Sequence, residues 1–310
     1  MTTGIDLFAG GGGTTEGATA GGVEMLWASN HKQTTVDTHK LNHPHVQHKC
    51  QDLQQANWDQ VPGHDILFAS PCCQGHSMAS GKKRTSKSAE VSRATAWAVI
   101  GCMDVHRPEM AVIENVTDFL VWELFPSWLD ALNRMGYAVS INEVNAMNCG
   151  VAQSRNRIFI VASKSKSPIR LPTFNDPIVP AIDLIDLSFE NNRWELVSDR
   201  NEKTQNRVYN GRKQYGELFL VAQYGSAKSG RSIYKPLGTI TTVPKHYVVY
   251  GEYIRPLSIK ELSAFQSFPK SYLWPIDFKP RTSTITKEMI GNAVPPRVMR
   301  KITEFLLKAS

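Results

Sequence analysis

A short apolar segment that runs directly into four consecutive glycines is the feature that most constrains this chain. Residues 4–8 (GIDLF) have the length and composition of a buried strand, and residues 9–14 (AGGGGT) follow without a gap. A strand, a glycine turn and a helix begin an α/β unit, in which the turn and the positive end of the helix can approach a nucleotide. The spacing G-x-G-x-x-G fails in every register and no P-loop lysine follows, so a turn that binds no ligand also stays open.

Apolar strands alternate with helical patterns over the first 165 residues. We expect strands at 4–8, 24–28, 65–69, 110–113, 138–144 and 158–162, and helices at 95–105 and 126–135. Strands this apolar suit a sheet that is covered on both faces, so the predicted fold class is α/β with a doubly wound sheet. From about residue 163, prolines and polar residues interrupt every long periodic pattern, and we place a domain boundary there.

The composition indicates a folded protein of about two domains. The 310 residues are 41% hydrophobic and 20% charged, which excludes a disordered tail. No apolar run reaches the ~18–20 residues of a membrane span, and the first residues lack the pattern of a signal peptide, so we expect a cytoplasmic protein. Five cysteines are too few for a disulfide framework and are interpreted as thiols.

Basic charge is concentrated in the middle of the chain. The whole chain has a formal net charge of +7, and residues 203–260 contain ten basic residues against only Glu217 and Glu252, with seven tyrosines interleaved. Such a concentration is compatible with binding to nucleic acid. The ten basic residues are Lys203, Arg207, Arg212, Lys213, Lys228, Arg231, Lys235, Lys245, Arg255 and Lys260.

Polar segments beside three of the expected strands could carry chemistry. Residues 70–77 (SPCCQGHS) follow a strand, at the end where α/β proteins place their ligands. The adjacent cysteines allow metal binding, a nucleophilic thiolate or buried core thiols. Glu114 follows another strand, and Arg155 and Arg157 alternate before a third; taken alone, these are as typical of a helix cap and a solvated edge.

The order of these segments resembles the DNA cytosine-5 methyltransferase family. The matching motifs are residues 6–12 (DLFAGGG), 71–77 (PCCQGHS), 114–116 (ENV), 153–157 (QSRNR), 255–269 (from RPLSIKEL to FP) and 291–296 (GNAVPP). Six motifs in the family's order, spread over most of the chain, make the resemblance specific. It implies a Rossmann-like methyltransferase domain over residues 1–165, completed by 282–310, and a target-recognition domain over 166–281.

The resemblance implies methyl transfer to C5 of a cytosine that is flipped out of double-stranded DNA. Cys73 would be the thiolate that adds at C6, because residues 74–77 (QGHS) fix the register in favour of the second cysteine. Glu114 would donate to N3 of the base. Arg155 and Arg157 would stabilise O2 and position the cysteine and the acid.

The resemblance also implies S-adenosylmethionine as cofactor and names the residues that hold it. Phe8 would stack beside the adenine, and the backbone of the glycine turn would approach the methionine part. His31 stands where the family usually has an acid for the ribose hydroxyls, and Asp52 matches the acid that contacts the adenine amino group. The implied set is Phe8, Ala9, Gly10, Gly12, Gly13, His31, Asp52, Asn292 and Val294, and a helix at about 296–307 would return to the N-terminal domain.

No metal is implied, and the cluster of His43, His45, His48 and Cys50 is interpreted as a solvated loop because it lacks the spacing of structural zinc sites. The basic residues 82–87 are interpreted as a loop that closes on the DNA backbone.

The alternative functions are a tRNA cytosine-5 methyltransferase and a catalytically inactive DNA-binding relative. We expect a monomer in a prokaryotic or phage-infected cell, with no membrane association and with a cognate restriction endonuclease as a candidate partner.

Overall fold

The computed structural model describes residues 1–72, 94–224, 227–279 and 281–309, which form two compact units. The first unit comprises Met1–Cys149, Asn156–Asn175 and Ala293–Ser310, and the second comprises Gly150–Arg155 and Asp176–Asn292. Residues 166–175 therefore belong to the first unit, and 150–155 and 282–292 to the second, which differs from the predicted boundaries. The assignment of the two parts of the chain to catalysis and target recognition stays a prediction.

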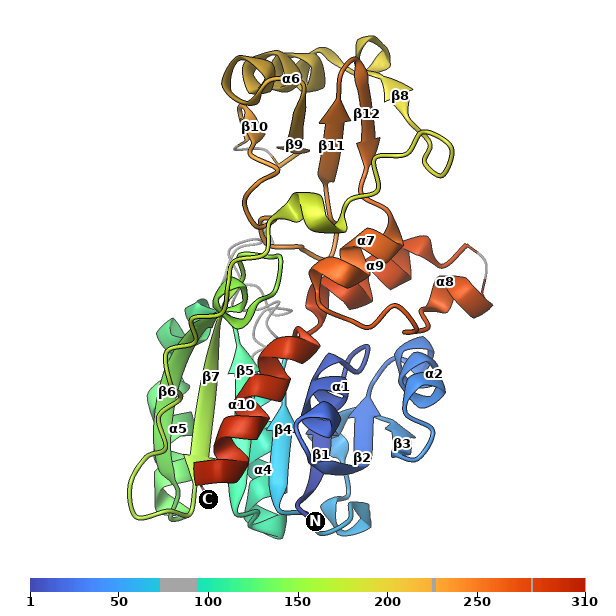
Figure 1. Cartoon of the computed structure of the whole chain (residues 1–310). Helices are drawn as coiled ribbons and strands as arrows, with labels where there is room; N and C mark the ends of the chain where they lie inside the picture. Colours follow the sequence, from blue (N-terminus) through green and yellow to red (C-terminus); the bar gives the residue numbers. More distant parts are fainter. Residues whose placement is uncertain (73–93, 225–226, 280, 310) are drawn as a thin grey trace. The chain divides into compact units, whose positions relative to one another are not determined.

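A seven-stranded sheet forms the centre of the first unit (Figure 1). Its strands are β1 (Thr3–Leu7), β2 (Glu24–Asn30), β3 (Gln47–Cys50), β4 (Ile66–Ala69), β5 (Met110–Asn115), β6 (Ala138–Asn145) and β7 (Asn156–Ser163). Their order is β3-β2-β1-β4-β5-β7-β6, in which the first five are parallel and β7 is antiparallel to both its neighbours. The six expected strands are all confirmed, and β3 is an edge strand that the sequence analysis missed.

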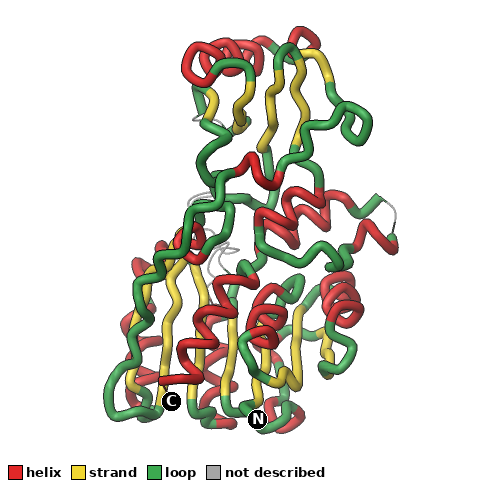
Figure 2. Tube along the Cα trace, viewed as in Figure 1, coloured by secondary structure: helices red, strands yellow, loops and turns green. Residues whose placement is uncertain are grey.

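Helices cover both faces of this sheet, as the tube in Figure 2 shows. They are α1 (Gly13–Ala20), α2 (Gln33–Asn42), α4 (Ala96–His106), α5 (Phe125–Arg134) and α10 (Pro296–Ala309). On one face, Ile5 of β1 shares a core with Val99 of α4 and Trp128 of α5. Because successive strand side chains alternate, Asp6 points to the other face, where it bonds Thr15 of α1. The predicted doubly wound α/β sheet is therefore confirmed.

Helix α10 packs directly on α1, although the two lie near opposite ends of the sequence (Figure 1). Gly17 permits this approach, since a Cβ there would lie 2.3 Å from the Pro296 carbonyl oxygen and 2.7 Å from Met299 Cβ. The predicted return of the last helix to the N-terminal part of the chain is confirmed. Among the residues that the structure describes, no helix is long and apolar enough to cross a membrane.

The second unit contains a five-stranded antiparallel sheet and four α-helices in its described residues. The strands, in the order β10-β9-β11-β12-β8, are β8 (Glu195–Leu196), β9 (Leu218–Ala222), β10 (Gly230–Arg231), β11 (His246–Tyr250) and β12 (Tyr253–Pro256), and the helices are α6 (Glu202–Tyr215), α7 (Ile259–Phe265), α8 (Pro275–Phe278) and α9 (Ser283–Asn292). Phe219 of β9 is fully buried, and a Cβ at Gly211 of α6 would lie 2.3 Å from its ring. Helix α6 and the sheet therefore share a tightly packed core.

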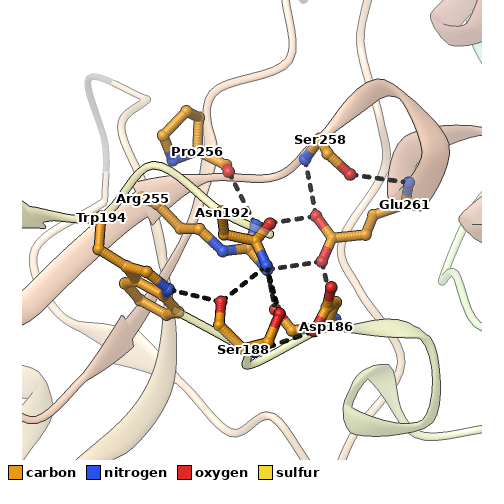
Figure 3. A network of polar contacts seen from close by, with 8 residues as sticks. All are labelled: Asp186, Ser188, Asn192, Trp194, Arg255, Pro256, Ser258 and Glu261. Atoms are coloured by element: carbon orange, nitrogen blue, oxygen red, sulfur yellow. Dashed lines mark hydrogen bonds and ion pairs between the residues drawn. The ribbon is translucent and has the colours of Figure 1, made fainter. Parts of the chain in front are cut away.

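A buried ion pair fixes the junction between β12 and α7 (Figure 3). Arg255 is 2% exposed, and its Nη2 lies 2.7 Å from Oε1 of Glu261. The Glu261 carboxylate also accepts from the Ser258 backbone N–H at 2.7 Å, while the Ser258 hydroxyl accepts from the Glu261 N–H, which makes a capping box. The Arg255 guanidinium carbon lies 5.0 Å from the centre of the Trp194 ring. Arg255 is therefore part of the interior and does not add to an exposed basic surface.

Candidate active site

The glycine turn between β1 and α1 has a backbone conformation that most side chains disfavour. Gly10 and Gly12 have φ angles of 54° and 89°, and Phe8 has a φ of 60°. The N–H of Ala9 donates to the Ser29 carbonyl at 3.0 Å, which ties the turn to β2. Gly12 is the N-cap of α1, so the positive end of that helix presents bare backbone. A non-glycine residue held at positive φ costs of order 1–3 kcal/mol and is typical of ligand-binding segments.

His31 and Asp52 follow the next two strands at the same edge of the sheet. His31 comes directly after β2, Asp52 comes two residues after β3, and both are exposed. The Cys50 thiol contacts the His31 carbonyl at 3.7 Å, and the Asp52 carboxylate caps the short helix at Leu53–Gln55 by accepting from the Gln54 N–H at 3.0 Å. The structure thus brings the glycine turn, His31 and Asp52 to the carboxyl ends of three adjacent parallel strands, where α/β proteins bind their ligands.

The segment before the predicted nucleophile follows β4, also at this edge. The side-chain amide of Asn115, at the end of β5, donates to the Pro71 carbonyl at 3.2 Å. The Cys72 N–H donates to the Thr95 hydroxyl at 3.0 Å, just before α4. These two bonds hold the chain up to Cys72. Cys73 and the basic loop that follows it lie outside the described residues.

Glu114 of β5 and Arg157 of β7 form an ion pair. Arg157 Nε lies 3.0 Å from Glu114 Oε1, and only 16% and 9% of the two side chains are exposed. The antiparallel pairing of β5 with β7 brings the two residues together, and the Asn156 carbonyl accepts a second bond from Arg157 Nη1 at 2.7 Å. A charge-assisted bond of this kind is short and directional, so it fixes the orientation of the carboxylate. These two predicted catalytic residues are in direct contact.

Arg155 has different surroundings from Arg157. It is 3% exposed and belongs to the second unit, where Nη1 donates to the Ile240 carbonyl and Nη2 to the Gly291 carbonyl, both at 3.0 Å. The neighbouring Gln153 donates to the Phe265 carbonyl at 3.2 Å. Both of these Arg155 bonds are with the backbone of its own unit. Its predicted role at O2 of the base stays a prediction.

The two predicted residues of the late motif fall in different units. Asn292 is the last residue of α9 in the second unit and is exposed, whereas Val294 lies in the first unit and is 3% exposed. Val294 stands two residues before α10. Their contact with a cofactor stays a prediction.

The histidine cluster after α2 corrects the interpretation of a solvated loop. His43 is only 3% exposed, and its Nε2 lies 3.8 Å from Oε2 of Glu16 on α1. Burial lowers the pKa of His43 to about 4. His43 is therefore buried beside α1, whereas His45 stays exposed. Among the described residues, no group of three or more His, Cys, Asp or Glu could hold a metal ion.

A chain of polar side chains on the buried side of the glycine turn was missed by the sequence analysis. Asp6 Oδ2 accepts from the Thr15 hydroxyl at 2.8 Å, Thr15 lies 3.0 Å from His39 Nε2, and His39 Nδ1 lies 2.8 Å from His48 Nε2. Burial raises the pKa of Asp6 to about 7 and lowers that of His39 well below its usual value. An acid in the middle of an otherwise apolar strand is the sequence signal that indicates such a partner.

The predicted basic segment is partly neutralised by local pairs. Besides Arg255, Arg212 is paired: its Nη2 lies 2.8 Å from Glu252 Oε1, and its Nε lies 3.6 Å from Glu217 Oε2. The two acids of this segment therefore both contact the same arginine. Several of the other basic side chains remain exposed, among them Lys228, Arg231, Lys235 and Lys245.

Comparison with known families covers almost the entire sequence. Residues 2–308 match the family described as C-5 cytosine-specific DNA methylase. The chain belongs to this family. Its members use S-adenosylmethionine as methyl donor, so this methylase is a DNA cytosine-5 methyltransferase with that cofactor.

Individual relatives agree with this family membership. The Type II methyltransferase M1.HphI of Haemophilus parahaemolyticus is 26% identical over 98% of this chain and 86% of its own length. M.HhaI of the same organism is 26% identical over 96% of this chain and 92% of its own. The crystal structure of the S. pombe Dnmt2 methyltransferase superposes with a TM-score of 0.69 at 14% identity, over 99% of this chain and 98% of that one. This likeness confirms the predicted methyltransferase fold.

Proposed function

We propose that this methylase acts on a cytosine flipped out of double-stranded DNA, through a covalent bond between Cys73 and C6 of the base. The observation that carries this proposal is the Glu114–Arg157 ion pair at the end of β5, next to Asn115, which binds the Pro71 carbonyl in the segment before the nucleophile. An acid held by an arginine beside a cysteine segment suits attack on a pyrimidine ring. Flipping follows from the chemistry, because C5 and C6 cannot be attacked inside a stacked duplex.

Each residue of the proposed site acts at a stated atom of the base. The Cys73 thiolate adds at C6, which makes C5 nucleophilic. Glu114 binds the N3 and amino edge, and Arg157 orients Glu114 and supplies positive charge while the ring gains electron density. Arg155 is proposed to act at O2. After C5 is methylated it loses its proton, and the thiolate leaves C6.

The residues at the carboxyl edge also fit S-adenosylmethionine, which supplies the methyl group when bound. The bare backbone at the positive end of α1 and the exposed side chains of His31 and Asp52 support this fit. Phe8 would lie beside the adenine, His31 at the ribose hydroxyls and Asp52 at the adenine amino group. The proposed set is Phe8, Ala9, Gly10, Gly12, Gly13, His31, Asp52, Asn292 and Val294.

Two adjacent thiols make the nucleophile assignment testable. We expect Cys73→Ser to abolish methyl transfer while DNA binding is kept, and Cys72→Ser, its matched control, to keep substantial activity. Adjacent side chains of an extended chain point in opposite directions, so only one thiol can reach C6. Duplex DNA with 5-fluorocytosine at the target should trap the enzyme through Cys73, because fluorine blocks the elimination step. An adduct on Cys72, or no adduct when the cofactor and a confirmed target sequence are present, would overturn this mechanism.

The substrate decides between this proposal and two alternatives. Tritiated methyl groups should pass to duplex DNA and not to tRNA. Transfer to tRNA alone would favour a tRNA cytosine-5 methyltransferase, and transfer to neither would favour an inactive DNA-binding relative. Bisulfite sequencing of DNA from cells that express the protein would identify the methylated sequence.

We also propose that residues 166–281 read the target sequence, which the exposed basic side chains between 228 and 245 support. A monomer suffices for this reaction, because one active site modifies one base. The curated relatives above are Type II methyltransferases from a bacterium. On that basis we propose a prokaryotic or phage-infected cytoplasm as the site of action and a cognate restriction endonuclease as a partner.

A further inference from the structure

Four side chains from four different elements form one polar chain within the first unit. Asp6 lies in β1, Thr15 in α1, His39 in α2 and His48 in β3, with successive contacts of 2.8, 3.0 and 2.8 Å. Asp6, Thr15 and His39 are at most 2% exposed, and His48 is half-buried. Three successive contacts between these side chains therefore connect the four elements.

We propose that three segments bind the cofactor, and these segments follow β1, β2 and β3. The four elements adjoin all three segments. Residues 7–14, between Asp6 and Thr15, contain the glycine turn, so the Asp6–Thr15 bond closes the base of that loop. His31 directly precedes the residues that lead into α2, and Asp52 follows β3. Four successive glycines have many conformations to lose when a ligand binds, and a clamp at the base of the loop reduces that loss.

When Asp6 is ionised, the hydrogen bonds that link these four side chains can be donated in only one direction, toward the Asp6 carboxylate. The Thr15 hydroxyl has a single hydrogen and donates it to Asp6, so it must accept from His39 Nε2–H. His39 Nδ1 then accepts from His48 Nε2–H. This arrangement requires neutral His39, which burial and the neighbouring His43 and His48 favour by lowering its pKa. Both Thr15 and His39 therefore have a defined part in holding the carboxylate of Asp6.

A further histidine touches the turn from the same side. The ring of His43 lies 4.8 Å from the ring of His39 and forms a hydrogen bond with the Gly12 backbone. Glu16, on the first turn of α1, lies 3.8 Å from it. The glycine turn is thus held at Gly12 and at Thr15 by residues of one neighbouring helix and its C-cap.

We propose that Thr15 and His39 are positioning residues for S-adenosylmethionine, which hold the glycine turn in its cofactor-binding conformation through Asp6. This inference rests on the proposed cofactor site at that turn. Neither residue reaches the reacting atoms in this role, so their loss should weaken cofactor binding and leave the chemical step intact once cofactor is saturating.

The test compares isosteric changes at two buried threonines of the first unit. Thr15→Val removes the hydroxyl, and Thr15→Ser restores it. Thr303→Val is the matched control, because Thr303 on α10 is fully buried and its hydroxyl has no hydrogen-bond partner among the described residues. We expect Thr15→Val to raise the KM for S-adenosylmethionine about tenfold with kcat within about twofold of wild type, the effect of losing one bond to a charged group. Thr15→Ser and Thr303→Val should stay within about twofold in both constants.

A second pair of variants covers the case in which Thr15→Val does not fold. His39→Gln keeps an N–H donor for Thr15 and His39→Leu does not, so the KM should rise more in His39→Leu. Equal cofactor constants in Thr15→Val and Thr303→Val, equal effects of the two His39 variants, or a fall in kcat alone would overturn the positioning role. Phe8→Ala separates this failure from that of the proposed site. If Phe8→Ala weakens cofactor binding and the Thr15 and His39 variants do not, only the positioning role fails; if none of them does, the glycine turn is not the cofactor site.

Discussion

Asp6 should make the stability of the protein depend on pH in a way that Asp6→Asn removes. The side chain is fully buried, and desolvation raises its pKa from 3.8 to about 7 despite the hydrogen bond from Thr15. A raised pKa means that the folded state binds the proton more tightly than the unfolded chain. The resulting stabilisation is complete below pH 3.8 and is lost as the pH rises through 7. With about 1.4 kcal/mol per pKa unit, the whole effect is about 4 kcal/mol, of which about 2 kcal/mol falls between pH 5.5 and 8.

The measurement is the free energy of urea unfolding of wild type and Asp6→Asn at several pH values, followed by tryptophan fluorescence. The wild-type value minus the variant value should fall by about 2 kcal/mol between pH 5.5 and 8. Buried histidines such as His43 have lowered pKa values and destabilise the fold as the pH falls below 6.5, but they are present in both proteins. Asp65→Asn is the control, because hydrogen bonds from Thr3 lower the pKa of Asp65 and it stays ionised throughout this range. A difference between wild type and Asp6→Asn that does not change with pH would refute the reasoning.

Three further predictions concern catalysis, packing and DNA binding. Glu114→Gln should lower the rate constant of single-turnover methylation by a factor on the order of 10²–10⁴, and DNA affinity in a gel-shift assay should stay unchanged. Gly211→Ala should lower the free energy of unfolding by about 1–3 kcal/mol, because the new Cβ would lie 2.3 Å from the Phe219 ring. Gly63→Ala, where a Cβ would meet nothing within 4 Å, should have little effect. Lys228→Gln should weaken binding to every DNA sequence and reduce the slope of log K against log salt by about one unit, whereas a loss for one sequence only would make Lys228 a base reader.

The parts of the fold with strong apolar patterns could be predicted from the sequence, and the weakly patterned parts could not. The strand over Met110–Asn115 is entirely buried, and its apolar residues identify it. Strand β3 has the sequence QHKC with no fully buried residue, and α2 has few apolar side chains, so neither has a period that a sequence analysis detects. Both form because they pair with or pack on β2, which is a tertiary effect.

Burial of polar side chains was the main failure of the sequence analysis at the candidate site. The cluster that contains His43 lacks the spacing of structural zinc sites and is interpreted as a solvated loop, but His43 is 3% exposed and lies 3.8 Å from Glu16 of α1. Arg255 was counted with the basic segment because its partner Glu261 lies just beyond the counted residues. The capping-box spacing from Ser258 to Glu261 is visible in the sequence and indicates that Glu261 has a structural role. A count of charged residues describes the protein surface only after buried ion pairs such as Arg255–Glu261 are left out of the count.

Arg155 and Arg157 stand two residues apart in one short motif, and the sequence alone assigns them a joint role. The structure gives them different surroundings, which indicates two different physical roles. Arg155 is in the second unit and donates to the carbonyls of Ile240 and Gly291, whereas Arg157 is in β7 and holds Glu114. We therefore expect Arg155→Ala to lower the free energy of unfolding by about 1–3 kcal/mol, because two buried carbonyls lose their donor. Arg157→Lys keeps a positive charge beside Glu114, which is only 9% exposed, so it should leave stability closer to wild type. It should lower kcat at saturating cofactor, because lysine cannot reproduce the guanidinium contact. Thermal unfolding and single-turnover methylation of the two variants test this division, and equal losses of stability in both would contradict it.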